Sequence, residues 1–360
     1  MAALRQRGLQ RMGAILLQNS AIHAGVILHH PARRGNLRGP ICFAGICSTM
    51  DIDLESTLIV RKDNVMKATT LFSAIILLGL LGGPPARAAR PGGSFQLRPN
   101  VSKKEVVYKT VDDLQLKLHV FEPKQRSPRR QLPAIVFFFG GGWNGGTPAQ
   151  FFPQCDYLAS RGMVAVSAEY RTKGNGGVTP FECVNDGKSA IRYVRSHAAE
   201  LGIDPNKLAA GGGSAGGHVA AATGTLKGLE PPGEDTSVSS RPNALVLFNP
   251  VYDNGPGGYG YSRVKERYKE ISPLHNIGPH VPPAIVFFGT EEKLVSRDAA
   301  EQFKEEMEKL EIRSDLHYYE GQSHGFFNYG RGNNVYFIKT MREADKFLAA
   351  LGFLTGEPQL

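Results

Sequence analysis

The sequence predicts an α/β protein built on a mostly parallel central sheet that is flanked by helices. From about residue 104 onward, short apolar segments alternate with segments of helical periodicity. This alternation is typical of parallel strands joined by crossover helices. Most of the short segments are continuous apolar runs, as in strands that are buried on both faces. No internal repeat and no long linker divides the body, so we expect a single domain over residues 89–360.

The expected elements follow in chain order. Residues 106–110 and 114–121 alternate apolar and polar side chains around Asp112 and Asp113, which predicts an antiparallel edge pair. Buried strands are expected over residues 134–139, 163–168, 207–210, 244–248, 284–288 and 316–319, and helices over 181–201, 218–226 and 335–351. Ser296 is expected to cap a further helix. Residues 251–282 are irregular and rich in Gly, Tyr and Pro, which predicts a small lid over the carboxyl edge of the sheet.

The positive charge is concentrated outside the body. Residues 1–88 carry 10 Lys and Arg against 4 Asp and Glu, whereas the remaining 272 residues carry 32 against 29. Nucleic-acid binding needs basic residues clustered on the folded part. The only such cluster in the sequence is the short Pro-containing turn at 124–130. We therefore expect no nucleic-acid partner.

Residues 66–88 have the pattern of a secretory signal peptide. A short basic start precedes an apolar run of 11 residues, which is followed by Gly-Gly-Pro-Pro and an Ala-Arg-Ala cleavage box ending at Ala88. The run is too short for a membrane span, which needs about 20 apolar residues. We expect export to the periplasm or the extracellular space and a mature terminus near Ala89. Residues 1–65 are an uncertain leader: either translation starts at Met66, or the first 50 residues are an organelle-targeting segment.

The body contains two cysteines, Cys155 and Cys183. In an oxidising compartment they could pair, and otherwise they are two buried thiols on separate helices. No cluster of His, Cys, Asp or Glu in the sequence has metal-ligand spacing. We expect no metal and no organic cofactor. The sequence does not indicate an oligomeric state.

The strongest chemical signal is Gly-Gly-Ser-Ala-Gly at residues 212–216, which fits the G-x-S-x-G pattern. It lies between an expected strand and an expected helix, where a sharp turn exposes the hydroxyl of Ser214. Residues 140–142 are three glycines after the strand 134–139. Because an oxyanion needs N–H donors that approach it closely, we expect an oxyanion hole formed by Gly141, Gly142 and Ala215.

A serine nucleophile needs a neighbouring base, and an imidazole is suited to this near neutral pH. His324 alone among the ten histidines lies in a short loop directly after a strand late in the chain. His218 follows Ser214 on the same helix and is expected to pack. A third group must orient the imidazole. We choose Glu292, in the loop after residues 284–288, over Asp298, whose place in a first helical turn is explained by the helix dipole.

With these motifs in the order Ser214, Glu292, His324, residues 104–352 resemble an α/β-hydrolase of the acetyl-esterase, hormone-sensitive-lipase-like branch. That branch usually has His at the position of Phe139, Asp at the position of Gly213, and Asp as the triad acid. These departures suggest a neighbouring esterase lineage.

The resemblance implies a serine carboxylesterase that hydrolyses short-chain acyl esters through an acyl-enzyme. Together with export, it suggests the O-acetyl groups of carbohydrates as substrates, with a small-molecule or glycan ester as the partner. Four aromatic residues are candidates for substrate binding: Trp143, Tyr252, Tyr259 and Tyr261. They either stack on a sugar ring or cover the edge of the core. Two alternatives stay open: a serine peptidase of the same fold, and a hydrolase fold kept only as a binding protein.

Overall fold

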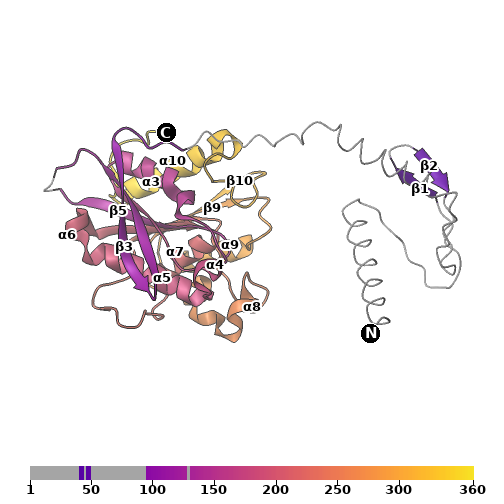
Figure 1. Ribbon diagram of the computed structural model, residues 1–360, viewed down its shortest axis with the longest axis horizontal. Helices are drawn as coiled ribbons and strands as arrows, with labels where there is room; N and C mark the ends of the chain where they lie inside the picture. The colour runs from indigo at the N-terminus through magenta and orange to yellow at the C-terminus, as the bar shows by residue number, and fades with distance from the viewer. Residues whose placement is uncertain (1–39, 44–45, 50–94, 128–129) are drawn as a thin grey trace, which may run out of the picture. The chain divides into compact units, whose positions relative to one another are not determined.

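The computed structural model describes residues 40–43, 46–49, 95–127 and 130–360 (Figure 1). The chain divides into two compact units, Met1–Ala88 and Ala89–Leu360. In the first unit, β1 (Pro40–Phe43) and β2 (Ile46–Thr49) pair antiparallel. The signal peptide expected at 66–88, the mature terminus near Ala89 and most of the leader 1–65 lie outside the described residues.

The second unit is built on an eight-stranded sheet with the order β10-β9-β8-β7-β5-β6-β4-β3. The six strands from β5 to β10 are parallel to one another, whereas β3 and β4 form an antiparallel hairpin at one edge. The expected fold class and the edge pair are thereby confirmed. The strands are β3 (Val101–Val111), β4 (Leu114–Pro123), β5 (Leu132–Phe138), β6 (Val164–Ala168), β7 (Ile203–Gly213), β8 (Ala244–Phe248), β9 (Ala284–Gly289) and β10 (Ser314–Tyr319).

Helices cover both faces of this sheet (Figure 1). The α-helices are α3 (Phe152–Ser160), α4 (Lys173–Gly176), α5 (Pro180–Ser196), α6 (Ala198–Leu201), α7 (Ala215–Thr225), α8 (Tyr261–Val264), α9 (Arg297–Lys309) and α10 (Val335–Ala350). The 3-10 turns are η1 (Pro148–Phe151), η2 (Lys265–Glu270), η3 (Pro273–Asn276) and η4 (Gly332–Asn334). α3 and α10 are joined by the fully buried carboxylate of Asp345, which accepts hydrogen bonds from the Tyr157 hydroxyl and, at 2.7 Å, from Arg161 Nε.

Most expected elements are shifted by a few residues at their ends, and two differ in a way that has a structural explanation. The helix expected over 181–201 is divided at His197, whose backbone has φ −99° and ψ 23°, and a second short helix follows as α6. The strand expected over 207–210 continues as β7 through three glycines, which pair with β8 and in part with β5. Because glycine is depleted in strands, the sequence predicted an end of this strand before its three glycines.

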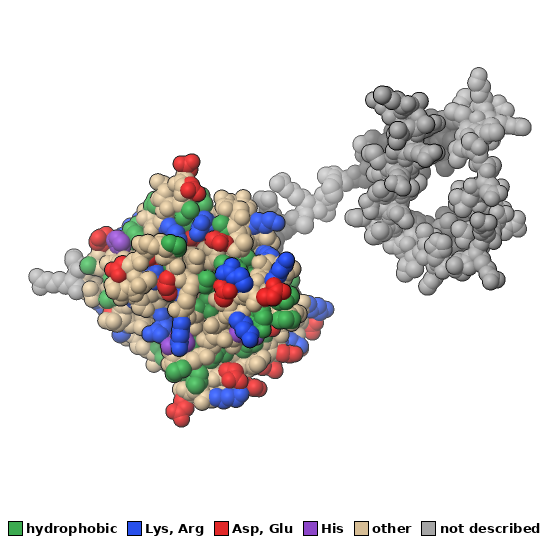
Figure 2. Space-filling view, turned by 90° about the horizontal axis from the view of Figure 1, so that it is seen from below, with side chains coloured by type: hydrophobic (Ala, Val, Ile, Leu, Met, Phe, Trp, Pro, Cys, Tyr) green, Lys and Arg blue, Asp and Glu red, His purple; other side chains and the backbone are tan. Residues whose placement is uncertain are grey.

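The core is apolar, and the surface carries mixed charge. Large aromatic side chains fill the space around the central strands, among them Phe137, Phe138, Phe151, Phe248 and Phe287. Lys and Arg are interspersed with Asp and Glu on the face shown in Figure 2. None of the helices in the described part of the chain is long and apolar enough to cross a membrane.

The two cysteines of the body are free thiols. Cys155 lies on α3 and Cys183 lies on α5, and both are buried. Burial raises the pKa of each thiol, which keeps both in the protonated form. Of the two alternatives left open by the sequence, the structure has the separate buried thiols.

Candidate active site

Ser214 lies on the sharp turn between β7 and α7, in the middle of the sheet. Its backbone has φ 55° and ψ −122°, a conformation that residues other than glycine rarely adopt. The turn is held because the Ser214 N–H donates to the carbonyl of Phe248 at 2.9 Å, at the end of β8. A Cβ at Gly216 would lie 2.1 Å from the carbonyl oxygen of Phe138, so only glycine fits beside the turn. This geometry is typical of a nucleophile elbow.

His324 and Glu292 are joined at the carboxyl edge of the same sheet. His324 Nδ1 lies 2.7 Å from Glu292 Oε2, and the Glu292 carboxylate is fully buried. Its Oε1 accepts backbone hydrogen bonds from Leu294 at 2.8 Å and Val295 at 3.3 Å. Burial alone would raise the pKa of Glu292, but the hydrogen bonds from His324 and Leu294 outweigh it and hold the pKa below its ordinary value. Glu292 is therefore an anion at neutral pH.

Ser214 and His324 line one cavity of about 300 Å³, together with the glycines 140–142. The cavity lies where β5, β7 and β10 end, because the carboxyl ends of parallel strands meet at one edge of a sheet. Its remaining lining residues are Asn144, Gln150, Tyr259, Leu294, Gly325, Phe327 and Asn328.

The glycine loop has a backbone that only glycine adopts without strain. Gly141 has φ 130° and Gly142 has φ 61°, and a Cβ at Gly141 would lie 2.1 Å from the carbonyl oxygen of Gly145. Gln150 holds the loop by accepting the N–H of Gly140 at 2.6 Å. Among the described residues, the N–H groups of Gly141 and Gly142 have no hydrogen-bond acceptor, so they are free to bind an oxygen in the cavity.

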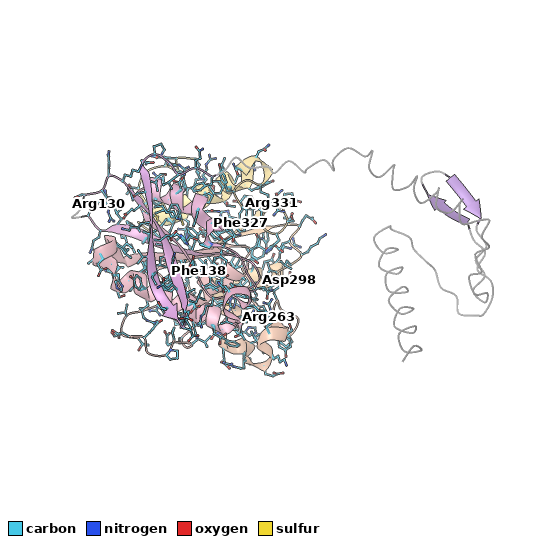
Figure 3. All side chains as sticks on the ribbon, in the orientation of Figure 1. Arg130, Phe138, Arg263, Asp298, Phe327 and Arg331 are labelled. Atoms are coloured by element: carbon cyan, nitrogen blue, oxygen red, sulfur yellow. The ribbon has the colours of Figure 1, made fainter. Side chains whose placement is uncertain are left out.

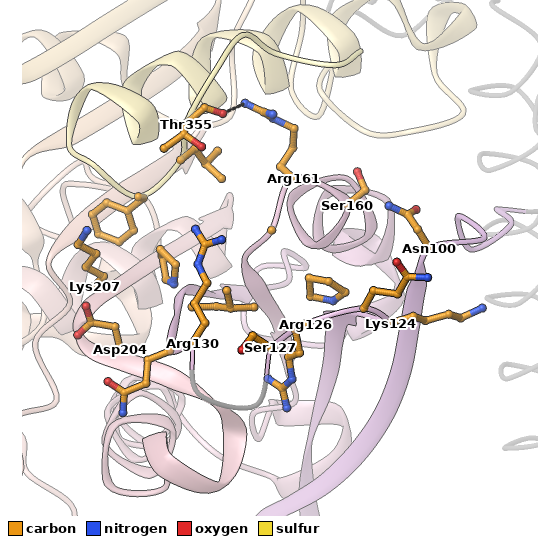
Figure 4. A pocket seen from close by; sticks show the side chains of 18 of the residues that line it. Asn100, Lys124, Arg126, Ser127, Arg130, Ser160, Arg161, Asp204, Lys207 and Thr355 are labelled. Carbon is orange, nitrogen blue, oxygen red and sulfur yellow. Dashed lines mark hydrogen bonds between the residues drawn. The ribbon is translucent and has the colours of Figure 1, made fainter.

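A larger cavity of about 900 Å³ lies at the opposite edge of the sheet and is lined by Arg126, Arg130 and Lys207 (Figure 4). Its lining includes Leu132 at the beginning of β5 and Asp204 near the beginning of β7. Arg130 lies across the body from Asp298 and Arg331 in Figure 3. No histidine is among the residues that line this cavity.

The structure also reveals site residues that the sequence interpretation missed. Asn249, which is fully buried after β8, donates from Nδ2 to Glu292 Oε2 at 2.8 Å and accepts the N–H of Gly325 at 3.4 Å. Gln150 donates to Asn328 Oδ1 at 2.9 Å, and Asn328 donates to the carbonyl of Gly325 at 2.8 Å. Asn249 could have been found, since a polar residue directly after a buried strand lies at the same sheet edge as the other candidates. Gln150 and Asn328 give no such signal.

Comparison with known proteins places this site in a family. Residues 118–247 match the BD-FAE family, and residues 259–354 match the dienelactone hydrolase family. The solved structure of the apo form of Thermogutta terrifontis esterase 2 is 48% identical, with a TM-score of 0.68 over 72% of this chain and 97% of that one. The chain belongs to the α/β-hydrolase esterases.

More distant relatives of this esterase are esterases as well. A probable isoprenylcysteine alpha-carbonyl methylesterase of Arabidopsis thaliana is 28% identical over 62% of this chain and 50% of its own length. Esterase LipC of Mycobacterium tuberculosis is 28% identical over 67% of this chain and 64% of its own length. The esterase thus spans between half and two thirds of the length of these curated relatives.

The two acids considered from the sequence differ in their contacts. Glu292 contacts His324, whereas Asp298 is exposed in the first turn of α9. His218 is fully buried and contacts Asn254 Oδ1 and the carbonyl of Ile271, each at 3.0 Å. Burial lowers the pKa of His218 to about 4, so the ring is neutral and packs as expected.

Of the two alternatives for the aromatic residues, the structure has the core for Trp143 and Tyr252, whereas Tyr259 lines the cavity of Ser214. Trp143 is 1% exposed and Tyr252 is 2% exposed. The Tyr252 ring is stacked on Phe303 with centroids 4.1 Å apart, and Trp143 packs edge-on against His218. Neither ring has a free face, because glycine-rich loops fold the aromatic residues inward. Tyr261 is half-buried and does not line the cavity of Ser214.

Proposed function

We propose that this chain is a serine carboxylesterase that cleaves short-chain acyl esters, with Ser214 as nucleophile, His324 as general base and Glu292 as the orienting acid. One observation carries the proposal. The buried Glu292 carboxylate contacts Nδ1 of His324, and the His324 ring lines the same cavity as Ser214. A carboxylate that accepts a hydrogen bond from Nδ1–H fixes the proton on Nδ1, so that Nε2 is the basic nitrogen of the ring. It also stabilises the imidazolium that forms when His324 accepts a proton.

In the acylation step, His324 Nε2 takes the proton of the Ser214 hydroxyl while Oγ forms a bond to the ester carbonyl carbon. The carbonyl oxygen becomes an oxyanion that accepts hydrogen bonds from the N–H groups of Gly141, Gly142 and Ala215. When the intermediate collapses, the bond to the alkoxy oxygen breaks and His324 gives its proton to the departing alcohol. The acyl group remains on Ser214.

Deacylation repeats these steps with water as the nucleophile. His324 takes a proton from water, the resulting hydroxide attacks the acyl carbon, and the second tetrahedral intermediate expels Ser214. The proton returns to the serine oxygen, and a carboxylic acid leaves. Ser214 and His324, with the ester and one water as reactants, account for the balance of atoms and charge.

We propose O-acetyl groups of carbohydrates as the natural substrates. A cavity of about 300 Å³ suits a small acyl group. Structures of Thermogutta terrifontis esterase 2 are described as propionate bound and butyrate bound, which supports short acids in this family. Asn144, an exposed polar residue at the cavity, suits a hydroxylated leaving group.

The proposal is tested with 4-nitrophenyl esters of increasing acyl length and with a fluorophosphonate probe. We expect the highest kcat/KM for the acetate ester and labelling at Ser214. Ser214→Ala should lose both, whereas Ser262→Ala, a change at an exposed serine of the lid, should retain both. Labelling without ester hydrolysis, or hydrolysis of peptides in preference to esters, would contradict the proposal.

We also propose that residues 66–88 direct export and are removed. The basic start, the apolar run and the Ala-Arg-Ala box support this. Sequencing the amino terminus of the protein purified from its natural source should find a start near Ala89, and an intact Met1 would refute the proposal.

A further inference from the structure

The glycine loop and the His324 loop follow strands that are not neighbours in the sheet. The glycine loop follows β5 and the His324 loop follows β10, and β7, β8 and β9 lie between these two strands. Strand pairing therefore does not fix the separation of the two loops directly. The proposed reaction nevertheless requires the base on one loop and the N–H donors on the other to act on one ester carbonyl.

One hydrogen bond joins the two loops. Gln150 Nε2 donates to Asn328 Oδ1 at 2.9 Å. Within the described residues, it is the only hydrogen bond between the segments 139–151 and 320–331. Both side chains are half-buried and line the cavity of Ser214. Water therefore competes with this hydrogen bond less than it does at an exposed surface.

Each of the two amides also binds a backbone group of the loop that it supports. Gln150 Oε1 accepts the N–H of Gly140 at 2.6 Å, one residue before the proposed oxyanion donors. Asn328 Nδ2 donates at 2.8 Å to the carbonyl of Gly325, the residue after His324. The three hydrogen bonds thus form a continuous chain from Gly140 through two side-chain amides to Gly325.

The direction of this chain is determined at both ends. A backbone N–H can only donate, so the oxygen of the Gln150 amide faces Gly140. A carbonyl can only accept, so the nitrogen of the Asn328 amide faces Gly325. The nitrogen of the first amide then meets the oxygen of the second, as the bond between them requires. Because every junction matches, each amide is held in a single orientation.

Two arginines hold the loops as well, but neither joins one loop to the other. Arg331 Nη1 donates to the carbonyl of His324 at 2.6 Å, within the segment that carries the histidine. Arg263 Nη1 donates to the carbonyl of Gly142 and so ties the glycine loop to α8 of the lid. The relation between the two loops is therefore left to the bond between the amides.

We propose that Gln150 and Asn328 are positioning residues that hold the oxyanion donors and the His324 ring at a fixed separation. They act through the two loops, and neither transfers a proton. A displacement of about 1 Å between reacting groups can lower a rate by about 100-fold. This inference rests on the proposed esterase function and deepens it, because it specifies what sets the geometry of the site.

The test uses the variants Gln150→Met and Asn328→Leu and their combination, which remove the hydrogen bonds but keep a similar side-chain volume. Each single variant should lower kcat for 4-nitrophenyl acetate by about 10-fold to 100-fold and leave KM within about threefold. Active sites are counted by fluorophosphonate titration, so that kcat refers to folded enzyme only. Gln302→Ala, at an exposed glutamine of α9, is the control and should change neither constant.

The double variant tests whether the two residues act as one unit. Either single change breaks the same bond, so the double variant should lose no more than about twofold in kcat beyond the weaker single variant. The loss should also be the same for the acetate and butyrate esters of 4-nitrophenol. Multiplicative losses, a loss confined to KM, or a loss that differs between the two esters would overturn the positioning role.

Gln150→Glu separates the bond between the loops from the support of Gly140 alone. Glutamate still accepts the Gly140 N–H but presents an oxygen to Asn328. If the Asn328 amide turns to donate to it, its own oxygen faces the Gly325 carbonyl, so one junction is broken in either orientation. We expect kcat to fall at pH 8 as it does in Gln150→Met, and a wild-type kcat would overturn the inference. This variant keeps the inference testable if a Met or Leu variant fails to fold.

The outcomes also separate this inference from the proposed function. Hydrolysis by the wild-type enzyme together with unchanged kcat in all variants would refute the positioning role and leave the esterase intact. Absence of hydrolysis of every aryl ester by the folded wild-type enzyme would refute the esterase itself.

Discussion

Replacement of Asn249 tests whether the buried amide positions the catalytic acid. Asn249→Ala removes the 2.8 Å hydrogen bond to Glu292 and the 3.4 Å contact from the Gly325 N–H. A hydrogen bond to a charged group contributes about 1.5–3 kcal/mol, and together with the weaker contact we expect a loss of about 2–4 kcal/mol in the free energy of unfolding. If this hydrogen bond strengthens in the transition state, where Glu292 faces the imidazolium of His324, its loss lowers kcat by about 10-fold to 100-fold.

KM provides the discriminating readout, because Asn249 does not line the cavity of Ser214. We therefore expect KM for 4-nitrophenyl acetate to remain within about twofold while kcat falls. Asn206→Ala, at an exposed residue near the beginning of β7, is the matched control and should leave both unchanged. A wild-type kcat for Asn249→Ala, or a loss confined to KM, would refute the positioning role.

Asn249→Asp tests the direction in which kcat changes with pH. The new carboxylate lies beside Glu292, and two carboxylates at this distance cannot both ionise easily, so the pKa of the pair rises. In its protonated form the introduced carboxyl group can still donate to Glu292 as the amide does. We expect kcat of this variant to fall as pH rises through the pKa of the pair, measured as a pH profile from about pH 5 to 9. A profile parallel to that of the wild-type enzyme would contradict the expectation.

Three further predictions concern the acid, the turn and the pH dependence of stability. Glu292→Ala should lower kcat by about 10³-fold or more and leave a small residual activity, whereas Asp298→Ala should leave kcat for 4-nitrophenyl acetate nearly unchanged; the reverse order would show that the wrong acid is assigned. Gly216→Ala should give little folded protein, as judged by circular dichroism and melting temperature, because the added Cβ meets the carbonyl of Phe138 at 2.1 Å; a wild-type melting temperature would contradict this. Because the pKa of Glu292 is lowered from 4.5 in the folded state, its ionisation stabilises the fold fully above pH 4.5 and progressively less as pH falls below it. The stability difference between wild type and Glu292→Gln, measured by denaturant unfolding, should therefore shrink between about pH 5 and pH 3, and a constant difference would refute the assignment.

Much of the fold could be predicted because its signals are local. Continuous apolar runs marked the parallel strands, and alternation around Asp112 marked the antiparallel edge pair. The glycine segment of β7 could not be predicted, since its strand conformation is imposed by β5 and β8 rather than by its own residues. The division of the helix at His197 is a change of backbone conformation at one residue, which hydrophobic periodicity does not report.

The candidate site was partly predictable for a topological reason. Ser214 was found from its motif, and Glu292 and His324 from their loops directly after strands; residues that follow parallel strands meet at one sheet edge, which is why the three candidates lie together. The sequence left two alternatives for the aromatic residues, because composition does not show whether a ring in a glycine-rich loop points to solvent or to the core. Trp143 and Tyr252 point to the core. Gln150 and Asn328 were missed because their contact joins segments 178 residues apart, a contact that only the tertiary fold produces.

The most direct test of the central claim is to trap the acyl-enzyme. The protein is mixed with 4-nitrophenyl acetate, quenched in acid within the first turnover, digested and examined by mass spectrometry. We expect one acetyl group on the peptide that contains Ser214, and its accumulation should be abolished in Ser214→Ala and strongly slowed in His324→Ala. An acetyl group on another residue at this stage, or turnover with no trapped acetyl group in a rapid-quench series together with an active Ser214→Ala variant, would contradict the account.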